Sequence, residues 1–259
     1  MPQESPASPL AQWYVISLRP QNLHAGVRKA ASALGARCFA MSPLRLRPLD
    51  AGRDLAQALA CPRILATSPA AVRMAHAQHP LDNAKDKTWL TVGRGSARAL
   101  HRLGIQRVLV PENGADSSAL LAHPELQDIH GQRIGLITAP GGRGLLEKSL
   151  RERGARLAVA HVYRREACAF GKSRIAALAT LPETTALMVS SGEAFEAGWR
   201  QFGSRGQETL RRRPAIASSQ RLAEMLVQNG FVTCLMARDA SPKAMLAALA
   251  AHVSSGRFR

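Results

Sequence analysis

The sequence has little of what cross-links a chain or anchors it in a membrane. Only four of its 259 residues are cysteines, and no two of them have the short spacing of a zinc or redox motif. We expect buried free thiols in a reducing compartment, and hence a cytoplasmic protein. No run approaches the roughly 18 apolar residues of a membrane span, and residues 1–12 predict a disordered tail, not a signal peptide or anchor. The cysteines are Cys38, Cys61, Cys168 and Cys234.

Motifs of several enzyme classes are missing as well. The sequence contains no nucleophile elbow, no HExxH zinc motif and no phosphate-binding loop with its lysine. The glycine-rich stretches 93–95 and 141–144 lack that lysine, and the eight histidines are scattered. We therefore expect neither a nucleotide nor a metal site. Any catalysis would depend on orientation and electrostatics, without a protein nucleophile.

Acidic residues are few relative to basic ones. Lysine and arginine number 35 against 18 aspartate and glutamate residues, which gives a formal net charge of +17. A field of this sign attracts polyanions such as nucleic acid, anionic lipid or a small polycarboxylate. Codon composition alone can also produce an excess of arginine, so the charge by itself does not choose among these partners.

Apolar strands and amphipathic helices alternate along the chain. We expect short strands at 13–18, 63–66, 88–92, 107–110, 133–138, 187–189 and 234–236, with helices between them. Two longer strands are expected at 38–46 and 157–165, and 203–213 is interpreted as a basic loop. This alternation predicts an α/β protein with parallel sheets and right-handed crossovers, whose ligands bind at the carboxyl ends of the strands.

The second half of the chain repeats the order of the first. A strand, a helix and Gly-Ala-Arg follow from 15–20 and again from 136–140. Segment 64–71 matches 187–194, and 93–110 matches 219–236 at equal length. Three ordered matches over more than 100 residues indicate an internal duplication.

Small or hydroxylic residues stand at the carboxyl ends of the expected strands. Each precedes a helix N-terminus, where free N–H groups and the helix dipole favour anions. We expect Ser68 and Ser117 to cap helices, as isolated serines at strand ends more often do than act as nucleophiles. Two such rims facing each other would form an anion-binding cleft. The candidate binding residues are Arg19, Ser68, Gly93, Ser117, Gly142, Arg143, Ser190, Ser191, Ser218 and Ser219.

The order of several short motifs over about 13–252 resembles the uroporphyrinogen-III synthase family. No single motif is specific, and the resemblance lies in their order and spacing. One departure is Ala139-Pro140, where the family pattern has Arg-Gly. The motifs are Arg19-Pro20, Thr67-Ser68-Pro69, Val92-Gly93, Pro111-Glu112, Asp116-Ser117, Gly142-Arg143, Arg153-Gly154-Ala155, Val162-Tyr163-Arg164-Arg165, Ser190-Ser191 and Ser218-Ser219.

The resemblance implies a particular fold, with two flavodoxin-like α/β domains of parallel sheets joined by a two-stranded β ladder. The first domain would be discontinuous, formed by 1–40 and 167–259, and the second would comprise 47–158. Residues 41–46 and 159–166 would be the connecting ladder strands. A duplication alone would instead suggest a division into 13–125 and 133–252.

The resemblance also implies an activity. The family are cyclising hydro-lyases that convert hydroxymethylbilane into uroporphyrinogen III with inversion of ring D, through azafulvene and spiro intermediates, without cofactor or metal. Tyr163 aligns with the family tyrosine proposed to help the hydroxyl group leave; packing at the hinge is its alternative role. We further expect a monomer that receives substrate from hydroxymethylbilane synthase and binds neither membrane nor nucleic acid.

A hypothesis from a different class stays open at this point. The chain could be a non-enzymatic, two-lobed binder of a small polyanion or of nucleic acid, with Arg211-Arg212-Arg213 as a contact. Aromatic residues for base stacking make up only 4% of the sequence, which argues against nucleic acid. Resolving the uroporphyrin isomers formed from hydroxymethylbilane would separate the enzyme from the binder.

Overall fold

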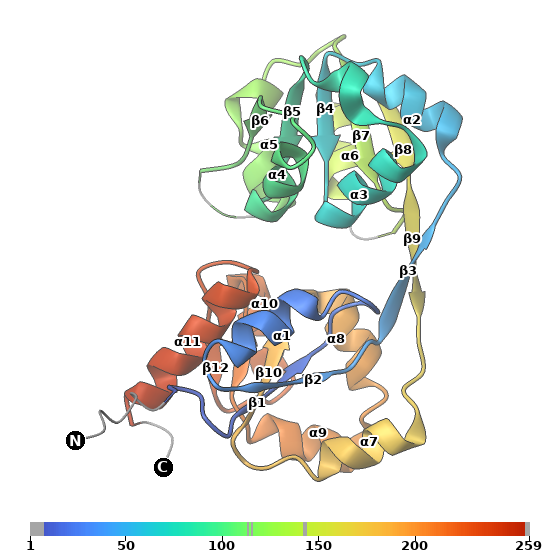
Figure 1. Ribbon diagram of the computed structural model, residues 1–259. Helices are drawn as coiled ribbons and strands as arrows, with labels where there is room; N and C mark the ends of the chain where they lie inside the picture. The colour runs from blue at the N-terminus through green and yellow to red at the C-terminus, as the bar shows by residue number, and fades with distance from the viewer. Residues whose placement is uncertain (1–7, 113, 115, 142–143, 257–259) are drawn as a thin grey trace, which may run out of the picture. The chain divides into compact units, whose positions relative to one another are not determined.

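The computed structural model describes residues 8–112, 114, 116–141 and 144–256. Its contacts divide the chain into two compact units (Figure 1). Unit 1 comprises Met1–Arg45 and Glu166–Arg259, and unit 2 comprises Leu46–Arg165. The chain therefore passes from one unit to the other twice. Within the described residues, no helix is both long and apolar enough to cross a membrane.

Unit 1 is built on a five-stranded parallel sheet in the order β12-β11-β10-β1-β2. Side chains alternate between its two faces, as a strand period of two requires. Val15 and Ile16 are both fully buried, and they belong to different core clusters. The strands are β1 Tyr14–Ser17, β2 Arg37–Ala40, β10 Thr185–Val189, β11 Ala215–Ala217 and β12 Cys234–Met236.

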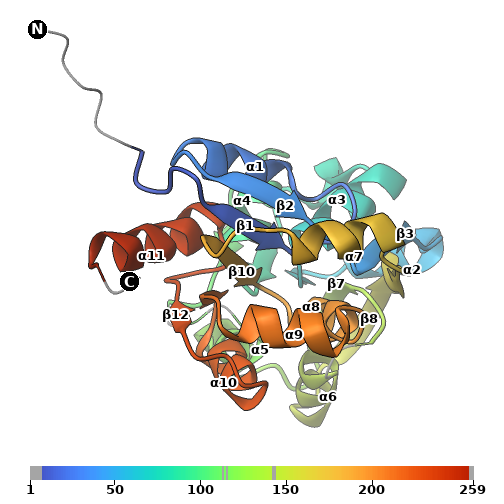
Figure 2. The ribbon, with the colours of Figure 1, turned by 90° about the horizontal axis from the view of Figure 1, so that it is seen from below.

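Helices cover both faces of this sheet. Val27 of α1 and Met245 of α11 pack in the cluster around Val15, whereas Phe195 of α8 and Leu210 of α9 pack in the cluster around Ile16. Figure 2 shows α1 and α9 on opposite sides of β1. The helices are α1 Ala25–Ser32, α7 Lys172–Ala179, α8 Gly192–Trp199, α9 Gly203–Arg211, α10 Gln220–Gln228 and α11 Pro242–Ser254.

Unit 2 has a second five-stranded parallel sheet, in the order β6-β5-β4-β7-β8. The helix α2 lies so close to β7 that a Cβ atom at Gly135 would clash with the Ala58 carbonyl oxygen. The strands are β4 Arg63–Ala66, β5 Thr88–Thr91, β6 Val108–Leu109, β7 Arg133–Thr138 and β8 Arg156–His161. The helices are α2 Gly52–Leu59, α3 Pro69–Gln78, α4 Arg94–His101, α5 Ser117–Leu121 and α6 Leu145–Glu152, with 3₁₀ turns at Leu81–Ala84 and Pro124–Leu126.

The two sheets have the same strand order. Strands β12, β11, β10, β1 and β2 correspond in sheet position to β6, β5, β4, β7 and β8. In unit 1 this is the flavodoxin-like order. The segments that match in sequence, such as 64–71 and 187–194, fall on corresponding strands, as an internal duplication predicts. Unit 2 has the same arrangement in circularly permuted order. The first strand of its sheet in sequence, β4, takes the position that β10 has in unit 1.

A separate two-stranded antiparallel sheet pairs β3 Leu44–Pro48 with β9 Tyr163–Ala167. The two long strands expected at 38–46 and 157–165 are therefore each interrupted. Strand β2 ends at Ala40 before β3 begins, and β8 ends at His161 before β9 begins. The physical reason is that one stretch of each strand completes a parallel sheet, whereas the next must leave that sheet to pair in the ladder.

Three local expectations were wrong. The stretch 203–213 is not a loop, because α9 occupies most of it. The N-cap of α5 is Asp116, whose carboxylate accepts from Ala119 N at 2.9 Å, and Ser117 is the first helical residue. Residues 8–12 form a turn instead of a disordered tail: Leu10 is fully buried and its N–H donates to Leu34 O at 2.9 Å. Residues 1–7 lie outside the described part.

Candidate active site

The topological switch point of unit 2 lies between β4 and β7, where the chain continues to opposite edges of the sheet. Ligands of open α/β sheets bind at the carboxyl ends of the strands beside such a point. Thr67 follows β4 and Thr138 ends β7, and the Thr67 hydroxyl donates to the Thr138 hydroxyl at 2.9 Å. The Thr67 backbone N–H also donates to Ile137 O at 3.2 Å. These bonds fix the end of the sheet at this point.

Ser68 connects the switch point to Tyr163. The serine is the N-cap of α3, and its hydroxyl oxygen accepts from Ala71 N at 3.0 Å. The same oxygen lies 3.1 Å from the Tyr163 phenol oxygen, within hydrogen-bond distance. Pro69 at the first helical position suits this cap, because its fixed φ angle fits the helix start and it lacks an N–H. Helix capping and the tyrosine contact therefore use one side chain.

Tyr163 is held from several sides. Its side chain is 5% exposed and belongs to the core cluster around Val72 of α3. The preceding residue, Val162, is fully buried and its N–H donates to Thr138 O at 3.0 Å, which fixes the start of β9 at the edge of the site. The Arg165 guanidinium lies 5.9 Å from the centroid of the tyrosine ring and donates to Pro140 O at 3.1 Å. The phenol is thus positioned by packing and by neighbours on both sides in sequence.

This arrangement is suited to proton donation. Either hydroxyl can donate in the 3.1 Å contact, and Ser68 Oγ, which accepts from Ala71 N, keeps its own hydrogen available for the phenol oxygen of Tyr163. The phenolic hydrogen is then available to another acceptor, such as an oxygen atom of a substrate. A hydrogen bond donated to the phenol oxygen also stabilises the phenolate that proton transfer would leave behind.

The corresponding switch point of unit 1 lies between β1 and β10. Ser17 pairs with Met188 at the end of the paired strands. Arg19 follows β1 by two residues, and Ser190 directly follows β10. The Arg19 guanidinium donates to Ala240 O at 2.8 Å, and burial lowers the pKa of Arg19. Arginine remains charged despite such a shift, so this rim carries a positive charge where unit 2 carries threonine hydroxyls.

The serines of unit 1 take different positions at this rim. Ser191 is the N-cap of α8, and its hydroxyl accepts from Ala194 N at 3.3 Å. Ser219 is the N-cap of α10 by its backbone conformation, but its side chain makes no capping hydrogen bond. Ser218 is tied to the neighbouring strand by a 3.2 Å bond from its N–H to Val189 O. The Ser219 hydroxyl and the first N–H groups of α10 are therefore suited to hold an anion.

A buried histidine bridges the ends of two strands in unit 1, and sequence analysis did not single it out. His24 is 3% exposed; its Nδ1 lies 3.0 Å from Ser17 Oγ and its Nε2 lies 2.8 Å from Ser42 Oγ. Burial, with smaller contributions from Arg28, Arg19 and Arg174, lowers the pKa of His24 to about 4. The neutral imidazole thus connects the end of β1 to the residues that lead into β3.

The remaining candidates lie further along the two rims. Gly93 is the N-cap of α4 after β5, and Ser117 begins α5 after β6. They stand one and two strands from β4, about 5 and 10 Å across the sheet. Gly142 and Arg143 lie outside the described residues. The structure therefore brings together Thr67, Ser68, Thr138 and Tyr163, whereas Gly93 and Ser117 extend the same edge.

The described residues contain no group of three or more histidine, cysteine, aspartate or glutamate side chains placed to hold a metal ion. All four cysteines are free thiols. Burial raises the pKa of Cys38, Cys61 and Cys234, with nearby basic groups opposing the shift at the first two. A raised pKa disfavours the reactive thiolate, so these side chains are poorly suited to act as nucleophiles.

Comparison with known proteins gives consistent matches. A family model described as uroporphyrinogen-III synthase HemD matches residues 26–247. The chain is 31% identical over 183 residues to uroporphyrinogen-III synthase of Escherichia coli (strain K12), covering 68% of this chain and 74% of that protein. It is 32% identical over 190 residues to the Salmonella typhimurium protein of the same name, covering 72% and 77%.

Solved structures of similar proteins share the fold. A mutant uroporphyrinogen III synthase from the extremely thermophilic bacterium Thermus thermophilus superimposes with a TM-score of 0.62 at 21% identity, covering 94% of this chain and 99% of that one. The Helicobacter pylori 26695 uroporphyrinogen-III synthetase gives 0.59 at 16% identity, covering 92% and 98%. The expected fold of two parallel-sheet α/β parts with a two-stranded ladder is confirmed. With the family model matching most of the chain, the conclusion is that this chain belongs to the uroporphyrinogen-III synthase family.

Proposed function

We propose that this chain performs the family reaction on hydroxymethylbilane at the strand ends of unit 2 that carry Thr67, Ser68 and Thr138, with Tyr163 as its general acid. The observation that carries the proposal is the 3.1 Å contact between Ser68 Oγ and the Tyr163 phenol at the switch point of the sheet. A neutral acid is suitable because the group that leaves is hydroxide. Donation of the phenolic proton lets it depart as water.

In the proposed reaction, a proton from Tyr163 starts the loss of the hydroxyl group. The pyrrole nitrogen of the ring that bears the hydroxymethyl group supplies the electron pair that expels the protonated hydroxyl, which gives water, a protonated azafulvene and a Tyr163 phenolate. The substituted carbon of ring D attacks the protonated azafulvene to form a spiro intermediate, which fragments and closes again with the ring inverted. The proton released when the last pyrrole regains aromaticity returns to the phenolate. The net change is the loss of one water molecule.

Folding the flexible substrate correctly requires more than an acid. Spontaneous closure gives the uninverted ring, so the protein must orient the chain and exclude water. We propose that Arg19, Ser190, Ser191, Ser218 and Ser219 bind substrate carboxylates. The N–H groups at the starts of α8 and α10 support this role. Gly93 and Ser117 would extend binding along unit 2, and Gly142 and Arg143 stay predictions.

Several aspects of the biological setting are also part of the proposal. We propose that the chain acts as a monomer in the cytoplasm and receives its unstable substrate from hydroxymethylbilane synthase. We further propose that units 1 and 2 are the two domains, and that β3 and β9 connect them. The four free thiols and the +17 charge are compatible with a reducing compartment and an anionic substrate.

The experiment that tests the activity is an isomer assay. The chain is mixed with freshly prepared hydroxymethylbilane, the products are oxidised, and the uroporphyrin isomers are separated. We expect the type III isomer to form well ahead of spontaneous closure. Type I isomer alone, formed at the rate seen without protein, would overturn the proposed function.

A further inference from the structure

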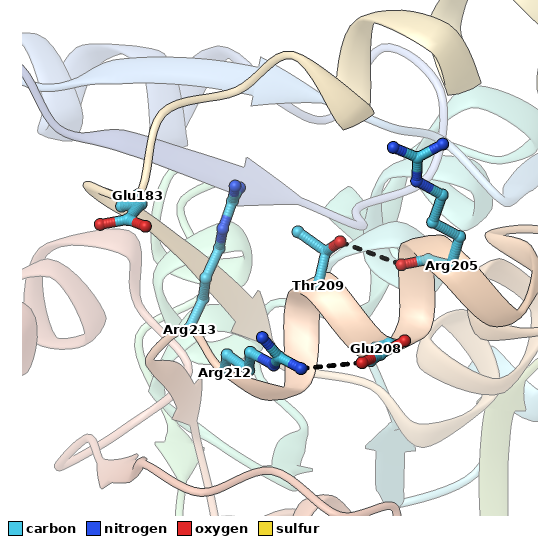
Figure 3. Close-up of a pocket in the computed structure, with 6 residues that line it drawn as sticks. All are labelled: Glu183, Arg205, Glu208, Thr209, Arg212 and Arg213. Carbon is cyan, nitrogen blue, oxygen red and sulfur yellow. Dashed lines mark hydrogen bonds and ion pairs between the residues drawn. The ribbon is translucent and has the colours of Figure 1, made fainter.

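Unit 1 contains a pocket that lies away from the rim described above. Its volume is about 460 Å³, and it lies between α9 and the segment that leads into β10 (Figure 3). Glu183 precedes β10 by two residues and Arg213 precedes β11 by two, so the pocket is at the amino ends of these strands. Ser190 and Ser218 follow the carboxyl ends of the same strands. The lining residues are Glu183, Arg205, Glu208, Thr209, Arg212 and Arg213.

Arg213 is the unusual member of this lining. Its side chain is only 8% exposed, and its Nη2 donates to Leu181 O at 2.8 Å. Its Nη1 is buried, and no hydrogen-bond partner for it exists in the part of the chain that the structure describes. Burial lowers the pKa of Arg213, an effect that the nearby Glu183 carboxylate opposes. A buried cation whose donors are not all satisfied is costly, so an anion held beside it in the pocket would be stabilised.

The other lining groups define what kind of molecule can bind. Arg212 Nη2 donates to Glu208 Oε1 at 2.8 Å, so these two charges largely neutralise each other, as Figure 3 shows. The Thr209 hydroxyl donates to Arg205 O at 3.0 Å and can still accept a hydrogen bond. Arg205 and Arg213 then outweigh the exposed Glu183 carboxylate, which can accept from a hydroxyl group. The pocket therefore offers cationic donors and separate acceptors.

We propose that this pocket binds a small hydroxylated organic anion, whose phosphate or carboxylate group is held by the Arg205 and Arg213 guanidinium groups and whose hydroxyl groups donate to Glu183. Its volume falls in the range of about 300 to 1,000 Å³ typical of small-molecule sites, larger than a bare ion needs. This site goes beyond the proposed function and does not depend on it. Strand β10 separates its residues from the Ser190 rim by about 15 Å of chain.

Calorimetric titration of the full chain at constant ionic strength tests the site. The probes are glycerol 3-phosphate, glycerate and inorganic phosphate, which distinguish an organic phosphate, a carboxylate and a bare ion. Ionic strength is fixed because a chain of net charge +17 attracts any anion. We expect one organic probe to bind in a one-to-one ratio and more tightly than inorganic phosphate.

Variants locate the binding. Arg213→Met and Arg213→Lys should weaken the binding of the organic probe by about 10-fold or more. This is the loss expected for a charge-assisted hydrogen bond. Arg200→Met removes an equal charge from an exposed position of unit 1 outside the pocket and should leave the affinity unchanged. Equal affinities in the Arg213 and Arg200 variants, or no binding of any probe by the native chain, would overturn the site.

Two measurements avoid the risk that Arg213 variants fail to fold. Glu183 is exposed, so the Glu183→Gln variant should fold normally. Its affinity for inorganic phosphate should rise by about 2- to 5-fold, because one repelling surface charge is removed. In the native chain, the nitrogen resonances of the Arg213 guanidinium should shift when the organic probe is added. An unmoved Arg213 signal at saturation would contradict the proposal.

Discussion

The two units have different side chains at the corresponding position of their two sheets. Unit 2 has Thr67 and Thr138 at its switch point, hydrogen bonded at 2.9 Å, with the Tyr163 phenol nearby. At the corresponding strand ends, unit 1 has Arg19 after β1 and Ser190 after β10. Neutral hydroxyl groups suit proton transfer, whereas a guanidinium suits a carboxylate. The repeated fold gives both units the same set of strand ends, whereas the residues that follow each strand give the two ends different chemistry.

Removing the phenol of Tyr163 should have the largest effect. Tyr163→Phe should slow turnover by roughly 10² to 10⁴, the usual contribution of a general acid, while the product stays mainly type III because the ring and the fold remain. Tyr14→Phe is the matched control, since Tyr14 is the chain's other tyrosine and its hydroxyl accepts from Arg37 in unit 1 at 3.0 Å. Rates and isomers are measured with hydroxymethylbilane.

Two results would contradict the proposed role of Tyr163 as a general acid. Full activity in Tyr163→Phe would mean that the tyrosine only packs at the start of the ladder. A full rate with the uninverted isomer as product would mean that its role is steric.

Lowering the pH should destabilise unit 1 through His24. Its pKa of about 4 lies below the unfolded value of about 6.5, so the unfolded chain binds the proton more readily. The stabilisation is complete above about pH 6.5 and is lost as the pH falls towards 4, by up to about 3 kcal/mol. Urea unfolding across this range should show the loss. His24→Gln should make the free energy of unfolding less dependent on pH, whereas His76→Gln, at an exposed position, should leave that dependence unchanged. A pH dependence in His24→Gln equal to that of the native chain would contradict the role of His24.

Neutralising the charge at the unit 1 rim should weaken substrate binding. Arg19→Gln should raise KM by about 10-fold or more, because a charge-assisted hydrogen bond to a carboxylate is lost, with a smaller change in kcat. Arg28→Gln removes an exposed charge from α1 and serves as the control. Steady-state kinetics distinguish the outcomes. A lowered kcat at unchanged KM would place Arg19 in the chemical step. The proposed division between substrate binding in unit 1 and proton transfer in unit 2 would then be wrong.

The smallest effects should come from the two matched helix caps. Ser68 and Ser191 both accept from the N–H of the residue three positions on, at 3.0 and 3.3 Å. Each change to alanine should cost about 1 kcal/mol of unfolding free energy. Only Ser68→Ala should also lower kcat, because only that serine contacts Tyr163. Denaturant unfolding and turnover are measured on both variants, and equal kcat values would argue against a role for the Ser68 contact.

Much of the fold was readable because its strands are short and apolar. Three of the expected strands coincide with β4, β7 and β12, at 63–66, 133–138 and 234–236. Flanking residues such as Pro69, which begins α3 shortly after β4, mark element boundaries clearly. Helix α9 was missed because it contains Gly203 and Gly206 and buries only Leu210. Such a helix lacks the apolar stripe on which periodicity depends.

The site was only partly readable. Ser68 and Tyr163 were both candidates, but 95 positions separate them and no local pattern shows that they touch. His24 gave no signal at all, because its partners Ser17 and Ser42 reach it only when β1 and β2 pair in parallel. Sequence patterns reveal what each strand end carries. Contacts between strand ends depend on sheet order and register, which arise from the whole fold.

The central claim is that Ser68 and Tyr163 act as one unit in proton donation. A double-mutant cycle with Ser68→Ala, Tyr163→Phe and the combined variant tests it most directly, with kcat for type III formation as the readout. If the serine acts only through the phenol, adding Ser68→Ala to Tyr163→Phe should lower kcat no further. Multiplicative losses, in which the double variant shows the product of the two single effects, would contradict the account.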